Sequence, residues 1–217
     1  MPPSGRAYYD ISPEITPELA VFPGDIPFSR EVNVDFGAGA NYLASSIHAT
    51  VHLGAHVDAP NHYSRSGSGI EARGLEYYFG DCQVIAVSLS RGRRIMPADI
   101  AHVRGLAPRV LFKTGSFPDP NRWNGDFNSL SPELIHELSE RGVILAGIDT
   151  PSVDPAEDGE LRTHQAISER DMAILEGIVL EGVPEGRYTL VALPLRIRGA
   201  DASPVRAILI PEEQGQL

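Results

Sequence analysis

SPELIHELSERGVILAGI, residues 131–148, combines the start of a helix with a strand that is apolar throughout, and this order decides the fold class. Ser131 is a typical N-cap, and Pro132 suits the first helical turn because its fixed φ and missing N–H fit that position. Apolar residues follow at helical spacing, and Gly142 is expected to end the helix. The continuous apolar run 143–148 then predicts a strand that is covered on both faces. A helix that leads into such a strand indicates an α/β domain.

Further apolar and β-branched runs predict that strands outnumber helices. The additional strands are expected at residues 83–89, 109–113, 188–195 and 205–210. A second helix is expected from Ser168 to Gly177, which includes the apolar residues Met172, Ile174 and Leu175. Residues 115–130 are rich in turn-forming residues, and a loop of this length is typical of a functional or partner-facing segment.

Length and charge exclude several classes of protein. The 217 residues (23.5 kDa) suit one domain or two very small ones. A net charge of −11 would repel phosphate backbones, so nucleic acid is not expected as a partner. The single cysteine, Cys82, permits neither an intrachain disulfide nor a zinc–thiolate cluster. No apolar run approaches the ~20 residues of a membrane span, and residues 1–8 lack the pattern of a signal peptide, so a cytoplasmic protein without membrane contact is expected.

Residues 52–62, HLGAHVDAPNH, hold three of the seven histidines together with one aspartate. A helix would align His52 with His56, but Gly54 and Pro60 disfavour a helix here. In an extended chain His52, His56 and Asp58 share one face. A flat strand, however, would place His52 and His56 roughly 13 Å apart along the chain. Two ligands of one zinc ion, each at ~2.0–2.2 Å, lie within about 4 Å of each other. We therefore expect the chain to bulge or fold at Gly54 and Pro60 to aim the last histidine separately.

Two alternatives are open for this segment. Its polar side chains could be scattered over a half-exposed strand, but three histidines and Asp58 on one face around a glycine favour a metal site. Nitrogen and oxygen ligands without sulfur suit Zn, Mn or Fe. The site could be mononuclear, with Asp58 as a terminal ligand, or binuclear, with Asp58 as a bridge. Further ligands would then come from His164, just before the second expected helix, or Glu176, near its end.

Three other polar residues are weaker candidates. His48 shares its parity with His52 and could support it, although a packed or surface role is more common for a single histidine. Asp149 and Asp154 follow the strand expected at 143–148, and they either line a pocket or cap turns.

Residues 52–62 resemble a motif of the cyclase-type metal hydrolases, and among them of the bacterial kynurenine formamidases. The family pattern His-x-Gly-[Thr/Ala]-His-x-Asp-x-Pro-x-His fits this segment at every fixed position. Three further segments match the family: residues 22–25 (Phe-Pro-Gly-Asp, where formamidases tend to have Trp-Pro-Gly-Asp), His164 with residues 174–177, and residues 193–195 with 199–207. The resemblance covers the chain from about Tyr9 to Ile210.

The resemblance implies a single hydrolase domain over residues 1–217, strand-rich, with mixed β-sheet layers and a few helices in a swivelling β/β/α-like arrangement. It also implies two divalent metal ions, zinc or alternatively manganese. In that binuclear site, His52 and His56 would hold the first ion, His164 would bind the second, and Asp58 and Glu176 would bridge the two. A homodimer is implied as well.

The activity implied by the resemblance is hydrolysis of N-formyl-L-kynurenine, a small aryl amide, to L-kynurenine and formate in tryptophan breakdown. His62 would give and take protons, and Phe22 would stack on the substrate ring. Phenylalanine keeps a π-face but lacks the indole N–H of the family's tryptophan. One alternative is a sister hydrolase that opens a cyclic amide such as isatin. Another is a metal-stabilised binding protein without turnover.

Overall fold

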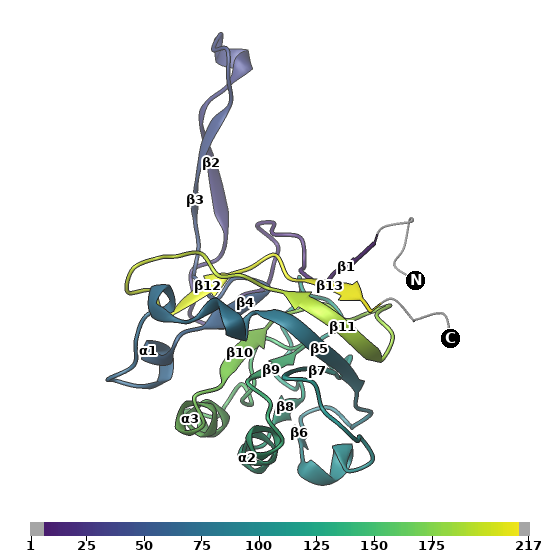
Figure 1. Ribbon diagram of the computed structural model, residues 1–217. Coiled ribbons are helices and arrows are strands. Elements are labelled where there is room, and N and C mark those ends of the chain that lie inside the picture. The colour runs from purple at the N-terminus through teal and green to yellow at the C-terminus, as the bar shows by residue number, and fades with distance from the viewer. Residues whose placement is uncertain (1–6, 213–217) are drawn as a thin grey trace.

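The centre of the molecule is a mixed β-sheet, seen in Figure 1. The computed structural model describes residues 7–212. In spatial order, the nine strands of this sheet are β1 (Tyr9–Asp10), β13 (Ile208–Pro211), β11 (Gly186–Val191), β5 (Phe79–Ala86), β7 (Arg109–Lys113), β9 (Leu145–Ile148), β10 (Ala173–Glu176), β4 (His56–Asp58) and β12 (Ala202–Pro204). The four strands from β5 to β10 run parallel, and the strands on both sides of them are antiparallel.

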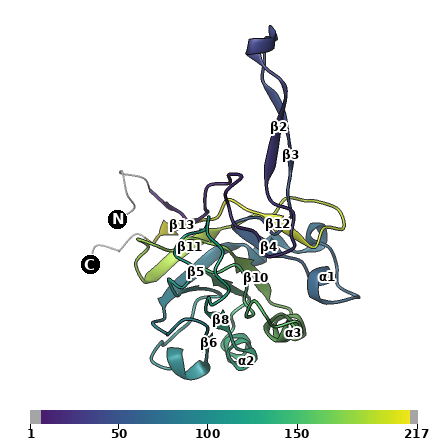
Figure 2. The same cartoon turned by 180° about the vertical axis from the view of Figure 1, so that it is seen from behind.

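Two helices pack on one face of the sheet, as Figures 1 and 2 show. They are α2 (Pro132–Glu140) and α3 (Arg162–Glu169), and a single helical turn, α1 (Pro60–Tyr63), precedes them in the chain. Ile135 and Ile167 of these helices join a buried cluster with Phe112 and Ile148 of the sheet. Each such side chain contributes ~1.5–3 kcal/mol when it leaves water. Every helix in residues 7–212 is too short or too polar to span a lipid bilayer.

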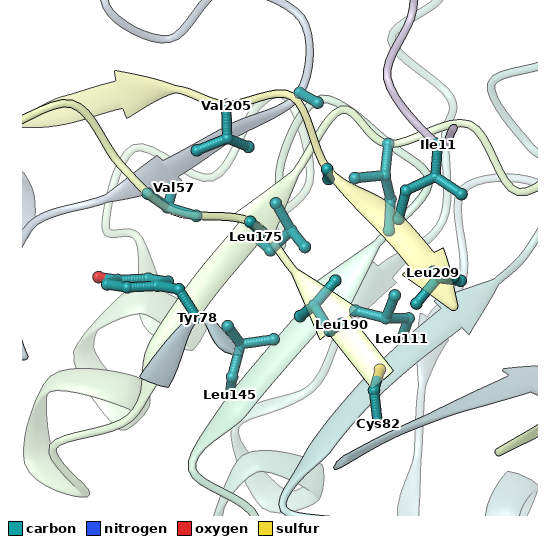
Figure 3. Close-up of a cluster of buried hydrophobic side chains, with 14 of the residues drawn as sticks. Ile11, Val57, Tyr78, Cys82, Leu111, Leu145, Leu175, Leu190, Val205 and Leu209 are labelled. Atoms are coloured by element: carbon teal, nitrogen blue, oxygen red, sulfur yellow. The ribbon is translucent and has the colours of Figure 1, made fainter. Parts of the chain in front are cut away.

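A second apolar cluster lies on the opposite face of the sheet (Figure 3). Neighbouring residues of a strand point to opposite faces, so Leu111 faces this cluster while Val110 and Phe112 face the helices. Leu145 of β9 and Leu175 of β10 lie beside Leu111 in the same cluster. Both faces of the central strands are therefore apolar, which explains their continuous apolar sequence and confirms the expected α/β class.

The strand expected at residues 109–113 coincides with β7, and the helix expected after Ser131 is α2. The hydroxyl of Ser131 accepts a hydrogen bond from the N–H of Leu134 at 3.1 Å, so its N-cap role is confirmed. The other expected strands are present with shifted limits. Residues 83–89, 143–148, 188–195 and 205–210 correspond to β5, β9, β11 and β13.

The helix expected from Ser168 to Gly177 is wrong. α3 ends at Glu169, Asp171 adopts φ +47, and the chain then enters strand β10 at Ala173–Glu176. A short apolar run such as Ala-Ile-Leu has no periodicity that separates a helix from a buried strand. Pairing with β9 on one side and β4 on the other decides in favour of the strand.

Two small sheets lie outside the main one. β6 (Arg94–Ile95) pairs with β8 (Ser129–Leu130), and β2 (Ser29–Val34) pairs with β3 (Ala44–His48). The β2–β3 hairpin projects away from the body of the molecule in both views (Figures 1 and 2). Short 3₁₀ turns occur at Phe36–Ala38, Ile70–Ala72, Leu75–Tyr77 and Pro97–Ile100.

Candidate metal centre

A turn at Gly54 lets the histidines on either side of it face one site. Gly54 has φ +58, a left-handed conformation that glycine adopts without strain. The ring centroids of His52 and His56 consequently lie 5.0 Å apart. β4 then continues in extended conformation, so His56 and Asp58 share one of its faces. The structure thus has the bend that the sequence predicts between His52 and Asp58.

Glu176 reaches the same site from the neighbouring strand. It is the last residue of β10, and its register partner on β4 is His56. Gly177, which follows it, has φ +64 and packs so closely that an added Cβ would lie 2.1 Å from the carbonyl oxygen of Gly54. A helix over residues 168–177 would not have placed Glu176 at this site. The absence of side chains at Gly54 and Gly177 lets the two chain segments approach each other closely.

His164 lies inside the first turns of α3, and Asp154 fixes its position. The Asp154 carboxylate accepts hydrogen bonds from the backbone N–H groups of Thr163 and His164. It also accepts one from His164 Nδ1 at 2.8 Å, which turns Nε2 toward the carboxylates of the site. Of the two roles that the sequence left open, Asp154 therefore has the capping one, and it also orients His164 although it does not line the cavity.

The five side chains expected to bind metal come together in the structure. Their closest distances are His52 Nδ1 to Asp58 Oδ1 at 3.0 Å, His56 Nε2 to Asp58 Oδ1 at 3.6 Å and to Glu176 Oε2 at 3.2 Å, and His164 Nε2 to Asp58 Oδ2 at 3.4 Å and to Glu176 Oε1 at 3.7 Å. Ligand atoms of His52, His56 and Asp58 all lie within 4.8 Å of one another. This spacing suits imidazoles and carboxylates that share one or two cations.

The imidazoles of His52, His56 and His164 each donate a hydrogen bond from the outer ring N–H to an oxygen acceptor. His52 Nε2 donates to Asp201 at 3.0 Å, and His56 Nδ1 donates to the carbonyl of Gly54 at 2.9 Å. His164 Nδ1 donates to Asp154, as described above. Metal-bound histidines show this pattern almost always, because the outer hydrogen bond fixes the ring and leaves the inner nitrogen with a free lone pair.

Asp58 provides an independent test of whether the site fits a cation. Its side chain is fully buried, and within residues 7–212 its two oxygens face only the imidazoles of His52, His56 and His164, with no backbone N–H or hydroxyl as a hydrogen-bond partner. A buried carboxylate without such partners costs several kcal/mol unless a cation compensates it. The donor set of imidazole nitrogen and carboxylate oxygen, without sulfur, fits a divalent metal ion.

In the metal-free site, the histidines and carboxylates shift one another's pKa values toward their charged forms. Burial alone would lower the pKa of His164, but the Asp154 and Asp58 carboxylates raise it to about 10. Burial also opposes charge on His52, but Asp58 and Asp201 raise its pKa to about 9. Burial alone would raise the pKa of Asp58, but His164 and His52 hold it well below its usual range. Two imidazolium groups therefore occupy this centre at neutral pH when no metal is bound.

His62 lies beside the cluster on α1, whose first residue is Pro60. Its ring centroid is 4.3 Å from that of His52, so Pro60 does not separate it from the other histidines as far as the sequence suggested. His62 Nδ1 faces Asp201 at 3.6 Å, and burial lowers the pKa of His62 below its ordinary value. A nitrogen of His62 also lies within 4.8 Å of ligand atoms of Asp58 and His164.

Asp201 is a site residue to which the sequence assigned no role. It precedes β12, the edge strand that pairs with β4, and it contacts both His52 and His62. Its only signal in the sequence is its place in the block of residues 199–207, because the pairing of β12 with β4 joins segments about 140 residues apart. His48 is exposed on β3, away from the site. Asp149 lines the cavity beside the site, as one of its two expected roles allowed, but its carboxylate accepts hydrogen bonds from Thr114 and Gly115.

The metal centre opens into a cavity of about 550 Å³. Its polar side is formed by the histidines and carboxylates described above. An apolar part of its wall contains Leu19, Val21, Phe22 and Phe117. Phe22, expected to contact the substrate ring, lines this wall and packs edge-on against Trp123 with centroids 5.1 Å apart. The cavity therefore combines an apolar surface with a charged centre, which suits a small amphipathic ligand.

Comparison with known families agrees with this geometry. The family model Cyclase, described as "Putative cyclase", matches residues 9–155, more than half of the chain. The chain belongs to the cyclase family. A cyclase-family relative from Bordetella petrii, named kynurenine formamidase, is 44% identical to it over 205 residues, which cover 94% of this chain and 98% of the relative.

Solved structures of the cyclase family share the fold. One, described as a potential metal-dependent hydrolase with cyclase activity, is 29% identical with a TM-score of 0.80, over 94% of this chain and 98% of that one. Isatin hydrolase A from Labrenzia aggregata is 22% identical with a TM-score of 0.78, over 93% and 92% of the two chains. At that identity the second likeness establishes only a common fold. Both confirm the strand-rich single-domain α/β architecture expected for a cyclase.

Gly177→Ala should destabilise the protein and weaken metal binding. The alanine would have to adopt φ +64, which is unfavourable for a residue with a Cβ. Its Cβ would also clash with the Gly54 carbonyl, which accepts the hydrogen bond that orients His56. We expect the free energy of unfolding to fall by about 1–2 kcal/mol for the left-handed backbone and by a further ~1–3 kcal/mol for the clash. Gly182→Ala is the matched control, because Gly182 has φ +72 but open space around its Cβ position. Equal denaturation midpoints and equal zinc affinities for the two variants would disprove the close-approach argument.

Proposed function

We propose that this protein hydrolyses N-formyl-L-kynurenine to L-kynurenine and formate at a centre of two divalent metal ions. The observation that carries the proposal is the convergence of three oriented imidazoles on Asp58, a buried carboxylate that has no other hydrogen-bond partner within residues 7–212. The chain that holds this centre is 44% identical, over nearly its full length, to a protein named kynurenine formamidase. A homodimer, implied by the family resemblance, and a location in the cytoplasm, expected from the sequence, complete the proposal.

The ligand set divides between two ions. His52 and His56 would hold the first, His164 would hold the second, and Asp58 and Glu176 would serve both, since the histidines face opposite oxygens of these carboxylates. Zinc is the metal we propose, with manganese as the alternative, because the donors are nitrogen and oxygen. When bound, such ions lower the pKa of water toward ~7 and polarise an amide carbonyl.

His62 is proposed to move the proton that the reaction requires. Nitrogen of an amide is a poor leaving group and must be protonated as the C–N bond breaks. Because burial lowers the pKa of His62, its imidazole is neutral at pH 7 and can take a proton before it donates one to the departing amine. Asp201, 3.6 Å from Nδ1, orients the ring so that Nε2 is directed away from this carboxylate.

Phe22 and the apolar wall are proposed to bind the aryl ring of the substrate. The ring would pack against Phe22 and Phe117 while the formyl group lies at the charged side of the cavity. Trp123 packs edge-on against Phe22 and so holds its ring in place. The aromatic wall thus selects aryl amides over aliphatic ones.

Parallel assays test the proposed substrate. Purified protein with zinc is given N-formyl-L-kynurenine and isatin separately, and we expect the larger kcat/KM for the formyl amide. A larger kcat/KM for isatin would assign the chain to the sister reaction. Absence of turnover with either compound, together with loss of the fold on chelation as seen by circular dichroism, would identify a structural metal and disprove the enzyme.

Metal binding should release protons at neutral pH. With pKa values raised to about 9 for His52 and about 10 for His164, both imidazoles carry an extra proton at pH 7 in the metal-free protein. That proton must leave before the inner nitrogen can bind a cation, so affinity rises with pH up to these values and falls as the solution is acidified. Calorimetric titration of the chelated protein with zinc in two buffers of different ionisation enthalpy should show up to two protons released. No proton release, and an affinity that is constant from pH 6 to 8, would contradict this charge arrangement.

A further inference from the structure

Arg94 is a partly buried cation that the proposed function does not use. It lies on β6, and its side chain is 22% exposed, whereas the neighbouring arginines Arg91 and Arg93 are exposed. Both views show β6 and β8 on the helix side of the main sheet (Figures 1 and 2). Ile95 and Leu130 of these strands belong to the buried cluster that α2 and α3 also join. A guanidinium group that turns toward such a core needs acceptors that compensate its charge.

The guanidinium of Arg94 joins two aspartates. Nη1 donates to Asp154 Oδ1 at 3.0 Å, and it also lies within hydrogen-bond distance of the Thr163 hydroxyl at 2.6 Å and the Leu130 carbonyl at 2.8 Å. Nη2 donates to Asp158 Oδ2. These four acceptors belong to three parts of the chain, namely β8, the segment between β9 and α3, and α3 itself. Because the donors of an arginine form a rigid plane, Arg94 fixes these parts relative to one another.

Asp154 connects Arg94 with the metal centre. Its Oδ1 faces Arg94, and its Oδ2 accepts from His164 Nδ1 at 2.8 Å. The Asp154 side chain is fully buried, and within residues 7–212 Arg94 is the only arginine or lysine that forms an ion pair with it. The two oxygens have different partners, so the contact with Arg94 fixes the rotation of the carboxylate and the direction in which Oδ2 meets the imidazole.

A second buried arginine shows what a guanidinium with a general structural role does in this fold. Arg109 is 6% exposed, and its hydrogen bonds go to three backbone carbonyls, those of Glu76, Tyr77 and Asp81. It therefore compensates backbone groups at the start of β7. Arg94 instead directs its charge at the carboxylate that orients a proposed metal ligand.

We propose that Arg94 is a positioning residue of the metal centre, which acts through Asp154 to hold His164 in the orientation that the second metal ion requires. Arg94 fixes Oδ1 of Asp154, and Oδ2 accepts the outer N–H of His164. The inner nitrogen of that ring, Nε2, then faces Asp58 at 3.4 Å. The inference rests on the proposed centre of two ions and is independent of which amide is hydrolysed.

Zinc titration of the chelated protein tests this role. Calorimetry against a competing chelator gives a Kd for each ion, and circular dichroism follows the fold. In Arg94→Gln we expect the second ion to bind ~10–100-fold more weakly, the usual cost of losing an outer partner of a metal ligand. The first ion, held by His52 and His56, should keep its affinity. Arg109→Gln is the matched control, because it removes a buried guanidinium from backbone carbonyls, and it should lower the denaturation midpoint without changing either Kd.

A double-mutant cycle tests whether Arg94 acts through Asp154. Asp154→Ala should weaken the second ion at least as much as Arg94→Gln, since it removes the acceptor of His164 itself. In the Asp154→Ala background, Arg94→Gln should cause no further loss, because the contact through which it acts is already absent. Losses that add in full would overturn the proposal.

Arg94→Lys keeps the inference testable if Arg94→Gln does not fold. Lysine retains the charge but lacks the planar fork that reaches both aspartates, so it should restore only part of the affinity for the second ion. Wild-type Kd values for both ions in a folded Arg94 variant would overturn the proposal, and so would an equal weakening of both ions. A wild-type protein that binds fewer than two ions would instead overturn the proposed centre, and this inference with it.

Discussion

Asp58→Ala is expected to lose both metal ions and to lower kcat/KM for the formyl amide by roughly 10⁴-fold or more, because the acidification of water that the metal centre supplies is lost. Asp58 lies between His52 and His164, with its oxygens 3.0 and 3.4 Å from their inner nitrogens, and no group other than the imidazoles hydrogen-bonds to it within residues 7–212. Metal content by inductively coupled plasma mass spectrometry and steady-state kinetics on the same sample measure both losses.

Asp149→Asn is the matched control for this variant. Asp149 is a buried carboxylate that lines the same cavity, but its hydrogen bonds go to Thr114 and Gly115 and not to the imidazoles. We expect it to keep the metal content of the wild type. Retention of two ions by Asp58→Ala would exclude Asp58 as a shared ligand.

His62→Ala has the second-largest expected effect. It should keep both metal ions and lower kcat by ~10²–10⁴-fold, the usual contribution of a general acid–base group. The expectation follows from the position of His62 at the cavity, where its Nδ1 faces Asp201 and its pKa is lowered by burial. His102→Ala is the control, because His102 is exposed and does not line the cavity, and this variant should leave kcat unchanged.

Metal content separates two roles for His62. One of its nitrogens lies within 4.8 Å of ligand atoms of Asp58 and His164, a distance at which it could also serve as a ligand. A variant that keeps two ions but turns over slowly supports proton transfer. A variant that loses an ion as it loses activity would make His62 a ligand, and full activity would disprove any role in the reaction.

Much of the sheet can be predicted from the sequence, because a strand covered on both faces must be apolar at every position. β7 coincides with the run at 109–113, and α2 begins at the N-cap Ser131. The same reasoning fails at β10, where four residues are too few to show a period, and only pairing with β9 and β4 makes the segment a strand. The β2–β3 hairpin was not expected, since its sequence is exposed and carries a weak apolar alternation.

The part of the metal centre that lies in one segment can also be predicted. His52, His56 and Asp58 are close in the chain, and a glycine between the histidines lets them converge. Asp154 and Asp201 could not be assigned with the same reasoning. Asp154 acts through the start of α3, and Asp201 acts through the pairing of β12 with β4, so their roles depend on tertiary contacts that no local spacing encodes.

Reconstitution of the chelated protein with zinc tests the central claim most directly. The metal-free protein is titrated with zinc, and hydrolysis of N-formyl-L-kynurenine is measured at each step. The proposed centre predicts no activity without metal and a rise that reaches its plateau at two equivalents of zinc per chain. Full activity in the fully chelated protein would contradict a metal centre at Asp58, and a plateau at one equivalent would contradict a centre of two ions.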